Sequence, residues 1–404
     1  MKLDRKRMYR FPWNRADNPG AWVEVTDYCN LTCPGCFRHR LEGDRSLEAV
    51  KQDILECQKR LNCDRIAISG GEPLLYPDIL EVVNFIARHN MKPMLLTNGE
   101  LMTVALAGRL KKAGLKMVYF HVDSGQRRPG WEGKSEAELN ELRERLADII
   151  WRVGGIQCGY NVTVSRRTLK EIGHIVEWGR KNIHKVQHIS LIAFRGLPVH
   201  EGIAYATKTG PVDLQALDNT SEDLSRINLT SEEIYAVLSR HFPGAYPTAY
   251  LNGTTDLESH KFLILLNLGS RNRIFGVVGA KTVELVQVFH HLFTGRYCAI
   301  LNNPRPGKKL FLLSPFDREI RRSLANYVRY TVTHPLALFR RLYVQCINIQ
   351  QPHEIINAQA NMCDGCVNLM MHEGALIHSC RLDEYRIYGG ALILYPSNLK
   401  GEAK

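Results

Sequence analysis

Between residues 21 and 194 the chain alternates short apolar runs with longer amphipathic stretches, and this alternation restricts the fold more than any other feature. The apolar runs predict strands at 21–26, 65–69, 93–96, 116–122, 156–164 and 188–193. The stretches between them predict helices at 47–61, 77–90, 101–113, 135–153 and 169–182, with Ser46 and Thr168 as N-caps and Gly99 and Gly114 as breakers. Strands that alternate with helices of this length form parallel βαβ units, so we expect an α/β fold.

Three cysteines follow the first predicted strand at the spacing Cys-x3-Cys-x2-Cys: Cys29, Cys33 and Cys36. Three thiolates on one loop can hold three corners of a cubic iron–sulfur cluster and leave its fourth iron open. A zinc knuckle or a set of core thiols is the alternative. Zinc sites usually repeat Cys-x2-Cys or add paired histidines, whereas the only histidine near this loop is His39.

Two further motifs follow the next two predicted strands. Gly70-Gly71-Glu72 comes after 65–69, and Thr97-Asn98-Gly99 comes after 93–96. Glycines at a strand end let the backbone turn sharply and approach a ligand closely. In parallel barrels the loops at these strand ends carry the chemistry, so the cysteine loop and both motifs are expected at one face.

Together these motifs resemble the signature of the radical S-adenosylmethionine (radical SAM) superfamily. The resemblance implies an open, partial (β/α)6 TIM-type barrel. It implies a [4Fe–4S] cluster on the three cysteines, and SAM bound by Gly70, Gly71, Glu72, Thr97 and Asn98. Polar residues at the fourth and fifth strands, Ser124 and Asn161, would touch the SAM carboxylate and ribose; ordinary turn capping is the alternative for both.

One position departs from the family pattern. The aromatic residue that usually precedes the third cysteine is replaced by Gly35, and Phe37 follows that cysteine instead. The adenine contact at this residue is therefore not carried over. Arg195, at the end of the sixth predicted strand, is either a partner for a carboxylate or phosphate or a surface arginine.

A second group of cysteines lies near the C-terminus: Cys363, Cys366 and Cys380, with Cys346 upstream. The arrangement loosely resembles the SPASM or twitch-type extensions of some radical SAM enzymes. These four residues are expected to hold a second [4Fe–4S] cluster, with a single zinc or iron as the alternative. Cys298 is the substitute for Cys346. His372-Glu373-Gly374 predicts a tight turn between two short strands.

Composition narrows the cellular setting. The chain of 404 residues contains no apolar run of about 18 residues and no signal peptide, so we expect a cytoplasmic protein without a spanning helix. In a reducing compartment eleven cysteines favour metal or cluster ligation over disulfides. Cys57, Cys63 and Cys158 fall in helix or strand patterns and are expected to be buried thiols.

The segment 304–344 is rich in both basic and apolar residues. It carries nine arginines and lysines against Asp317 and Glu319, with leucines and aromatic residues between them. Such a segment suits peripheral contact with an anionic membrane surface. A helix that packs on the core and presents a solvated basic face is the alternative. The formal net charge of +12 is consistent with an anionic partner. No nucleic-acid-binding module is recognisable, so we do not expect the protein to bind nucleic acid.

Four parts of the chain are expected. Residues 1–20 form a basic extension, 21–245 the partial barrel, 246–344 an apolar and basic wall that faces substrate or membrane, and 345–404 a smaller cysteine-containing domain. Within the polar insertion that follows residue 197, Thr230-Ser231-Glu232-Glu233 predicts a helix start.

The resemblance implies an enzyme, an oxidoreductase or transferase that cleaves SAM to a 5′-deoxyadenosyl radical and abstracts hydrogen from an unactivated C–H. It also implies a one-electron donor such as flavodoxin or ferredoxin. The basic apolar segment favours a lipid or another hydrophobic metabolite as the substrate. The sequence assigns no catalytic residue.

Two other functions remain open at this point. A peptide-modifying (RiPP) maturase would suit the second cysteine group, but no leader-binding segment precedes residue 21. A non-catalytic iron–sulfur electron carrier would not need the Gly70-Gly71-Glu72 motif.

Overall fold

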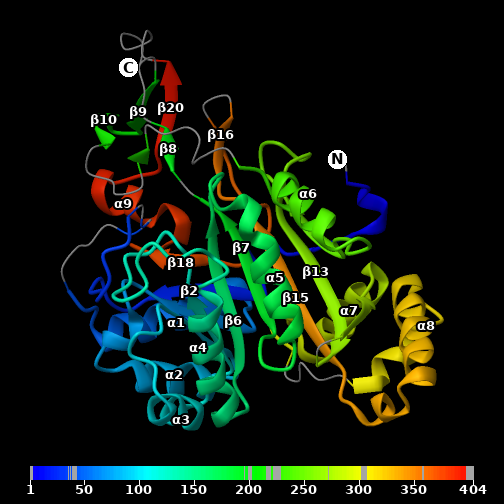
Figure 1. The fold of residues 1–404 in the computed structure, drawn as a ribbon. Coiled ribbons are helices and arrows are strands. Elements are labelled where there is room, and N and C mark those ends of the chain that lie inside the picture. The colour runs from blue at the N-terminus through cyan, green and yellow to red at the C-terminus, as the bar shows by residue number, and fades with distance from the viewer. Residues whose placement is uncertain are drawn as a thin grey trace.

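In the computed structural model, one large sheet runs through the molecule. The structure describes residues 3–34, 36, 38, 43–194, 196–198, 203–214, 220–221, 229–271, 273–301, 307–356 and 359–396. The sheet has the order β1-β12-β13-β15-β7-β6-β5-β4-β3-β2, with β14 paired to β13. Its parallel part is β2 (Gly20–Glu24), β3 (Arg65–Ser69), β4 (Lys92–Thr97), β5 (Met117–His121), β6 (Gln157–Val164) and β7 (His188–Ala193). The open, partial (β/α)6 barrel is thus confirmed (Figure 1).

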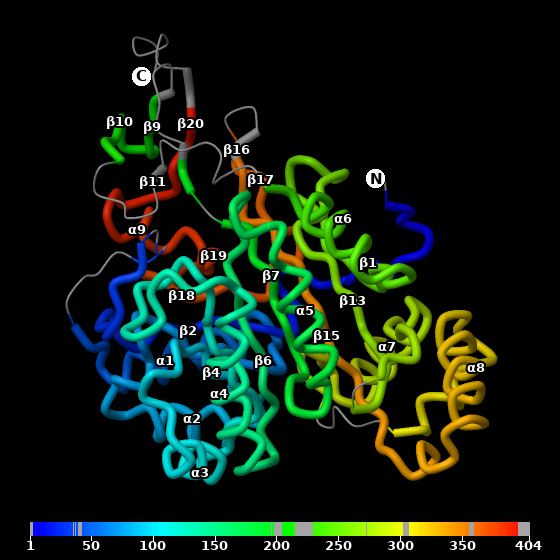
Figure 2. The backbone as a smooth tube through the Cα atoms, in the orientation of Figure 1, coloured from blue at the N-terminus to red at the C-terminus, as the bar shows by residue number. Residues whose placement is uncertain are grey.

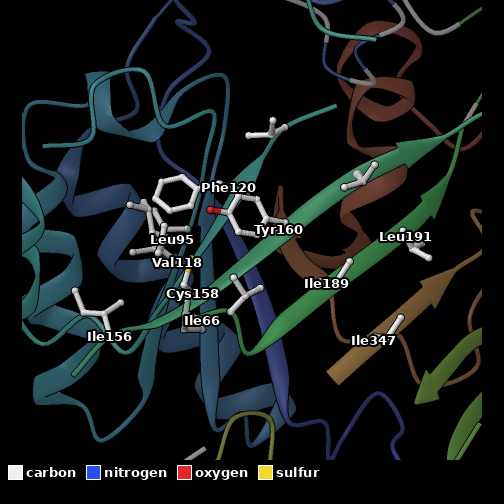
Figure 3. Packing of buried hydrophobic residues seen from close by; sticks show 14 of the residues in the cluster. Ile66, Leu95, Val118, Phe120, Ile156, Cys158, Tyr160, Ile189, Leu191 and Ile347 are labelled. Atoms are coloured by element: carbon white, nitrogen blue, oxygen red, sulfur yellow. The ribbon is translucent and has the colours of Figure 1, made fainter. Parts of the chain in front are cut away.

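Helices cover the outer face of these strands. They are α1 (Leu47–Leu61), α2 (Ile79–Arg88), α3 (Val104–Ala113), α4 (Asn140–Val153) and α5 (Ile172–Lys181). Alternate strand residues point outward and pack beneath the helices, among them Val118, Phe120, Tyr160 and Ile189 (Figure 3). Cys158 lies in the same core, and Cys57 and Cys63 are buried with it, as predicted.

Helix boundaries follow the capping chemistry in most places. Ser46 caps α1, since its side chain accepts a hydrogen bond from Ala49 N, and Gly114 ends α3 in the left-handed conformation. Two predictions are wrong. Helix α4 begins at Asn140 rather than at 135, and Thr168 precedes a 3-10 turn, η3 (Leu169–Glu171), without capping it.

Strands from the second half of the chain extend the same sheet. β15 (Tyr343–Gln350) pairs in parallel with β7, and β13 (His260–Ser270) runs antiparallel to β15. Beyond β13 lie β12 (Ala249–Asn252), β14 (Arg273–Val277) and the N-terminal β1 (Tyr9–Arg10). The expected domain boundary between residues 344 and 345 therefore falls inside a strand of the barrel sheet.

A helical unit projects from this extension. It consists of α7 (Ala280–Thr294), η5 (Gly307–Leu313), α8 (Arg318–Thr333) and η6 (Pro335–Phe339). Asp317 caps α8 and also accepts hydrogen bonds from Thr282 in the first turn of α7, which joins the two helices. Figure 1 shows α7 and α8 at the edge of the molecule opposite α1–α3. Among the described residues, none of the helices combines the length and the apolar content needed to cross a bilayer.

Small elements complete the structure around the barrel. The capping-box prediction is confirmed by α6 (Ser231–His241), which begins after Thr230. The predicted tight turn joins β18 (Leu369–His372) to β19 (Ala375–His378), and β18 packs against β2 and α1 (Figure 2). The remaining elements are η1 (Arg5–Arg7), η2 (Pro73–Leu75), β8 (Leu197–Pro198), β9 (Ile203–Thr207), β10 (Gly210–Val212), β11 (Thr220–Ser221), β16 (Glu354–Ile356), β17 (Gln359–Asn361), η7 (Ser379–Arg381), α9 (Leu382–Tyr388) and β20 (Ile393–Pro396).

Candidate functional site

The three cysteines of the first loop lie together just after β2. All three are half-buried and none forms a disulfide. The loop is tightened by a hydrogen bond of 3.3 Å from Cys36 N to Cys33 O, and Cys29 Sγ accepts one of 3.5 Å from Leu31 N. Burial raises the pKa of Cys33 to about 12, and the neighbouring Cys36, Asp123 and Cys29 add to the shift. Three close thiols on one loop fit three corners of an iron–sulfur cluster, whose binding would displace their protons.

The glycines after β3 lie directly against the start of the cysteine loop. Gly71 N donates to Thr26 O at 2.8 Å, and Glu72 N donates to Tyr28 O at 2.7 Å. Gly70 has φ +140°, and a Cβ at Gly70 would overlap the carbonyl oxygen of Thr26. A Cβ at Gly71 would overlap the carbonyl oxygen of Tyr28. Only glycine therefore allows these two chain segments to approach so closely.

We expect the substitution Gly70→Ala to disturb this junction. Alanine would have to hold an unfavourable positive φ while its methyl group displaces Thr26, which costs roughly 1–3 kcal/mol from the backbone alone. The matched control is Gly108→Ala in α3, where a Cβ meets nothing within 4 Å and alanine favours the helix. The melting temperature and the SAM affinity should both fall in Gly70→Ala and stay unchanged in Gly108→Ala. Equal melts for the two variants would contradict the close approach.

Glu72 connects the ends of β3 and β4. Its Oε1 accepts hydrogen bonds from Thr97 Oγ1 at 2.6 Å and from Leu74 N at 3.0 Å, and its Oε2 accepts one from Asn98 N at 2.7 Å. Burial raises the pKa of Glu72, and these three hydrogen bonds oppose the rise. Asn98 Nδ2 in turn donates to Asn30 Oδ1 at 2.8 Å, inside the cysteine loop. Three of the predicted SAM contacts, Glu72, Thr97 and Asn98, thus form one network with the cysteine loop.

Asp123 is the charged centre at the end of β5. Its Oδ2 lies 2.8 Å from His121 Nε2 and accepts a hydrogen bond of 2.9 Å from Thr163 N on β6. Burial alone would raise the pKa of Asp123, but His121 and the hydrogen bonds from Thr163 bring it down to about 2. The backbone N–H of the predicted site residue Ser124 donates to Glu136 Oε1 at 2.8 Å. Asn161 is the register partner of His121, so both side chains face the barrel interior.

Two buried arginines that the sequence analysis missed support these strand ends. Arg128, 2% exposed, donates to Asn98 O at 2.8 Å and to His121 O at 3.0 Å, which ties β4 to β5. Arg143 forms a fully buried ion pair with Glu136. Both lie in segments whose sequence looks like ordinary charged surface, so no local signal distinguishes them. Gly35, Phe37, His39 and Arg195 lie outside the described residues.

The C-terminal segment is attached to the cluster loop. Arg38, two residues beyond Cys36, forms a buried ion pair with Glu24 of β2 and donates to Ser379 O at 2.7 Å. Arg386 of α9 donates to Asp27 Oδ1 at 2.8 Å, at the start of the same loop. These contacts hold the region around Cys380 against the loop that carries the first three cysteines.

The second cysteine group is only partly brought together. Cys363 and Cys366 are neighbours, and both Cys366 and Cys380 lie near enough to Cys363 to raise its pKa. Cys346 is not with them. It lies on β15 opposite His188, the first residue of β7, and faces the lower barrel interior near Tyr119. Because β15 advances about 3.3 Å per residue, Cys346 lies roughly 13 Å below Gln350, where the strand ends.

Cys298, the predicted alternative to Cys346, lies apart from both cysteine groups. It is buried with Asp64 and His290, whose ligand atoms lie within 4.8 Å of one another and of its sulfur. Lys92 Nζ lies 2.7 Å from Asp64 Oδ2 and neutralises that carboxylate. This group is therefore better suited to fixing the segment beneath the barrel than to holding a cation.

Comparison with known proteins agrees with the site. The family model described as the radical SAM superfamily matches residues 23–179. A probable GTP 3′,8-cyclase from Methanocaldococcus jannaschii is 33% identical over 228 residues, which cover 53% of this chain and 72% of that protein. The 7,8-dihydro-6-hydroxymethylpterin dimethyltransferase of the same organism is 24% identical over 230 residues, 54% of this chain and 44% of that protein.

Other matches are shorter or structural. A probable GTP 3′,8-cyclase from Pyrococcus horikoshii is 34% identical over 108 residues, so the chain covers only 34% of that relative. Among solved structures, Streptococcus suis SuiB bound to S-adenosylmethionine gives a TM-score of 0.40 at 15% identity, covering 55% of this chain and 47% of that one. The strand-end geometry and the family match lead to one conclusion: the chain belongs to the radical SAM superfamily and is an enzyme that uses a [4Fe–4S] cluster and S-adenosylmethionine.

Proposed function

We propose that this enzyme abstracts hydrogen from an unactivated carbon of a lipid or another hydrophobic metabolite at a membrane surface. Cys29, Cys33 and Cys36 hold the cluster in this proposal, and the ends of β3 to β6 hold SAM. When bound and reduced by a donor such as flavodoxin or ferredoxin, the cluster supplies one electron that breaks the C5′–S bond of SAM, giving methionine and a 5′-deoxyadenosyl radical that takes the substrate hydrogen.

The chain's own residues would position these groups. Gly70 and Gly71 let the turn after β3 approach the start of the cysteine loop, where the methionine part would bind, while Glu72 fixes that turn. Arg128 and the Arg143–Glu136 pair hold the ends of β4 and β5, where Ser124 and Asn161 would meet the rest of SAM. The Arg38 and Arg386 contacts hold the segment 379–386 against the loop.

One observation carries the choice of an apolar, membrane-borne substrate. The unit formed by η5, α8 and η6 exposes large apolar side chains that the core does not use, namely Leu312 at 75%, Phe316 at 69%, Val332 at 78%, Leu336 at 73% and Phe339 at 85%. A single exposed leucine needs no explanation, but several on one small unit indicate an interaction surface. Further exposed apolar residues, Phe289, Leu292 and Phe293, lie on the neighbouring α7.

Helix α8 has one buried face and one exposed face, which supports this proposal. One face buries Ile320, Ser323 and Tyr327 against β14 and η5, as a core-packing helix would. The opposite face leaves Val328 and Val332 exposed. Exposed basic residues surround these apolar side chains, among them Lys308, Lys309, Arg318, Arg329, Arg340 and Arg341. This combination of aromatic, aliphatic and basic side chains suits an anionic lipid surface.

We expect the enzyme to float with vesicles that contain anionic phosphatidylglycerol and to float weakly with neutral ones. Each arginine near the surface adds about 1 kcal/mol, so Arg329→Gln with Arg340→Gln should weaken binding about 30-fold. Phe316→Ser with Leu336→Ser and Phe339→Ser should abolish it, and raised salt should reduce it in the wild type. The matched control is Leu101→Ser with Val104→Ser and Leu257→Ser, which removes exposed apolar residues elsewhere. No flotation with anionic vesicles would refute the membrane contact.

The substrate class is tested by activity. Anaerobic incubation with SAM and a reductant should yield 5′-deoxyadenosine in excess of background when a total lipid extract is added. Perdeuterated lipid should transfer deuterium into that product. If only a water-soluble or peptide fraction stimulates turnover, the lipid proposal fails and a soluble substrate replaces it.

A further inference from the structure

Two histidines lie among the C-terminal cysteines, and sequence analysis assigned neither a role. Cys380 Sγ lies 3.6 Å from His353 Nδ1. Cys366 Sγ accepts a hydrogen bond of 3.4 Å from Asn368 N, and His378 is a neighbour of Cys366. The segment 353–380 therefore contributes three sulfurs and two imidazoles to this region.

The Cys363–Cys366 turn is built against the barrel. Asp364 N donates to Asn252 O at 3.0 Å, and Asn252 N donates to Asp364 Oδ1 at 3.1 Å. A Cβ at Gly365 would lie 2.8 Å from Trp13 O, so the turn fits its neighbours only with glycine there. The two sulfurs are thus presented by a fixed turn rather than by a free loop.

His353 is oriented by a carboxylate. Its Nε2 lies 3.7 Å from Glu384 Oε1, and the two side chains are 2% and 1% exposed. Glu384 is itself held, because its Oε2 accepts hydrogen bonds from Arg381 Nε at 2.7 Å and from Leu392 N at 2.9 Å. A carboxylate on one imidazole nitrogen is the usual way in which proteins fix a metal-binding histidine, with the other nitrogen turned to the metal.

We propose that Cys363, Cys366, Cys380 and His353 Nδ1 form a closed, four-ligand metal centre, and that Cys346 is not part of it. Three thiolates and one imidazole suit a thiolate-preferring cofactor, either a [4Fe–4S] cluster or a single zinc ion. His353 lies three residues beyond the end of β15, whereas Cys346 lies in the middle of that strand and faces the barrel interior. This centre goes beyond the proposed function and does not depend on the substrate.

The experiment uses the full chain with Cys29, Cys33 and Cys36 replaced by alanine, so that only the second centre remains. After anaerobic reconstitution with iron and sulfide, or with zinc, bound metal is measured by mass spectrometry, and its release to a chelator is timed. About four irons with sulfide identify a cluster, and one zinc identifies a mononuclear site; either supports the centre. No bound metal would overturn it.

Further substitutions in that background identify the fourth ligand. His353→Ala should lose most of the metal, whereas His353→Cys should keep it with altered absorption and EPR spectra. Glu384→Gln should speed metal release by about 10- to 100-fold. Cys346→Ala is the matched control and should leave the metal content unchanged. Full occupancy in a folded His353→Ala, or loss in Cys346→Ala, would refute the assignment. The same substitutions are also made in a chain that keeps Cys29, Cys33 and Cys36. SAM binding by these proteins reports separately on the first cluster.

Discussion

Replacing Cys29, Cys33 and Cys36 together by alanine is expected to abolish reductive cleavage of SAM completely. The three thiols are the sulfur donors of one tightened loop, and removing them leaves the cluster without its protein ligands. Iron content should fall by about four atoms per chain, and the EPR signal that changes on addition of SAM should disappear. Production of 5′-deoxyadenosine under dithionite should fall to that of a mixture without protein.

The matched control for this variant is Cys346→Ala. It also removes a half-buried thiol, but one on β15 and remote from the cluster loop. We expect its SAM cleavage to equal that of the wild type. Residual SAM cleavage in the triple variant would place the radical cluster elsewhere in the chain.

Arg143→Met is expected to destabilise the fold by about 3–5 kcal/mol, because it leaves the carboxylate of Glu136 buried without a counter-ion. Both side chains are 0% exposed, and Arg143 also donates to Val122 O at 2.9 Å and Glu136 O at 2.8 Å. Since Glu136 holds Ser124 N, SAM affinity should fall along with stability. Urea unfolding followed by tryptophan fluorescence measures the first effect, and equilibrium dialysis of SAM measures the second.

Arg145→Met provides the comparison for this prediction. Arg145 lies on the exposed face of the same helix, where substitution should change the free energy of unfolding by less than about 0.5 kcal/mol. Adding Glu136→Gln to Arg143→Met should restore part of the lost stability, since the uncompensated charge is then gone. An Arg143→Met protein as stable as Arg145→Met would show that the buried pair contributes little.

Local sequence patterns were sufficient for the barrel. The predicted strands at 65–69 and 188–193 and the helix at 47–61 match β3, β7 and α1 residue for residue, because apolar periodicity and end signals agree there. Helix α4 was misjudged at its start, since Glu136 turns inward to meet Arg143 and Ser124 N instead of continuing a helical surface. The contacts of Glu136 depend on the neighbouring strand, so the local sequence does not reveal them.

Site residues could be predicted only where they belong to a short sequence motif. The Cys29 loop and the Gly70 turn follow directly from spacing and strand ends. The sequence analysis sought the fourth C-terminal ligand among the cysteines and named Cys346, whereas we propose His353. The proposal depends on knowing that β15 joins the barrel sheet beside β7, a pairing between segments that are far apart in the chain. Arg128 escaped notice for the same reason, since its partners come from two other strand ends.

The pairing of β1 with β12 has a consequence for how the protein is made. Tyr9 lies opposite Ala249, so the first strand leaves the ribosome 240 residues before its partner does. At about 5–20 residues per second, that interval lasts roughly 10–50 s. The parallel core β2–β7 can close during this time from contacts between successive units. Phe11 and Trp13 of the N-terminal segment therefore stay without their packing partners during this time, which exposes them to misfolding and to chaperones.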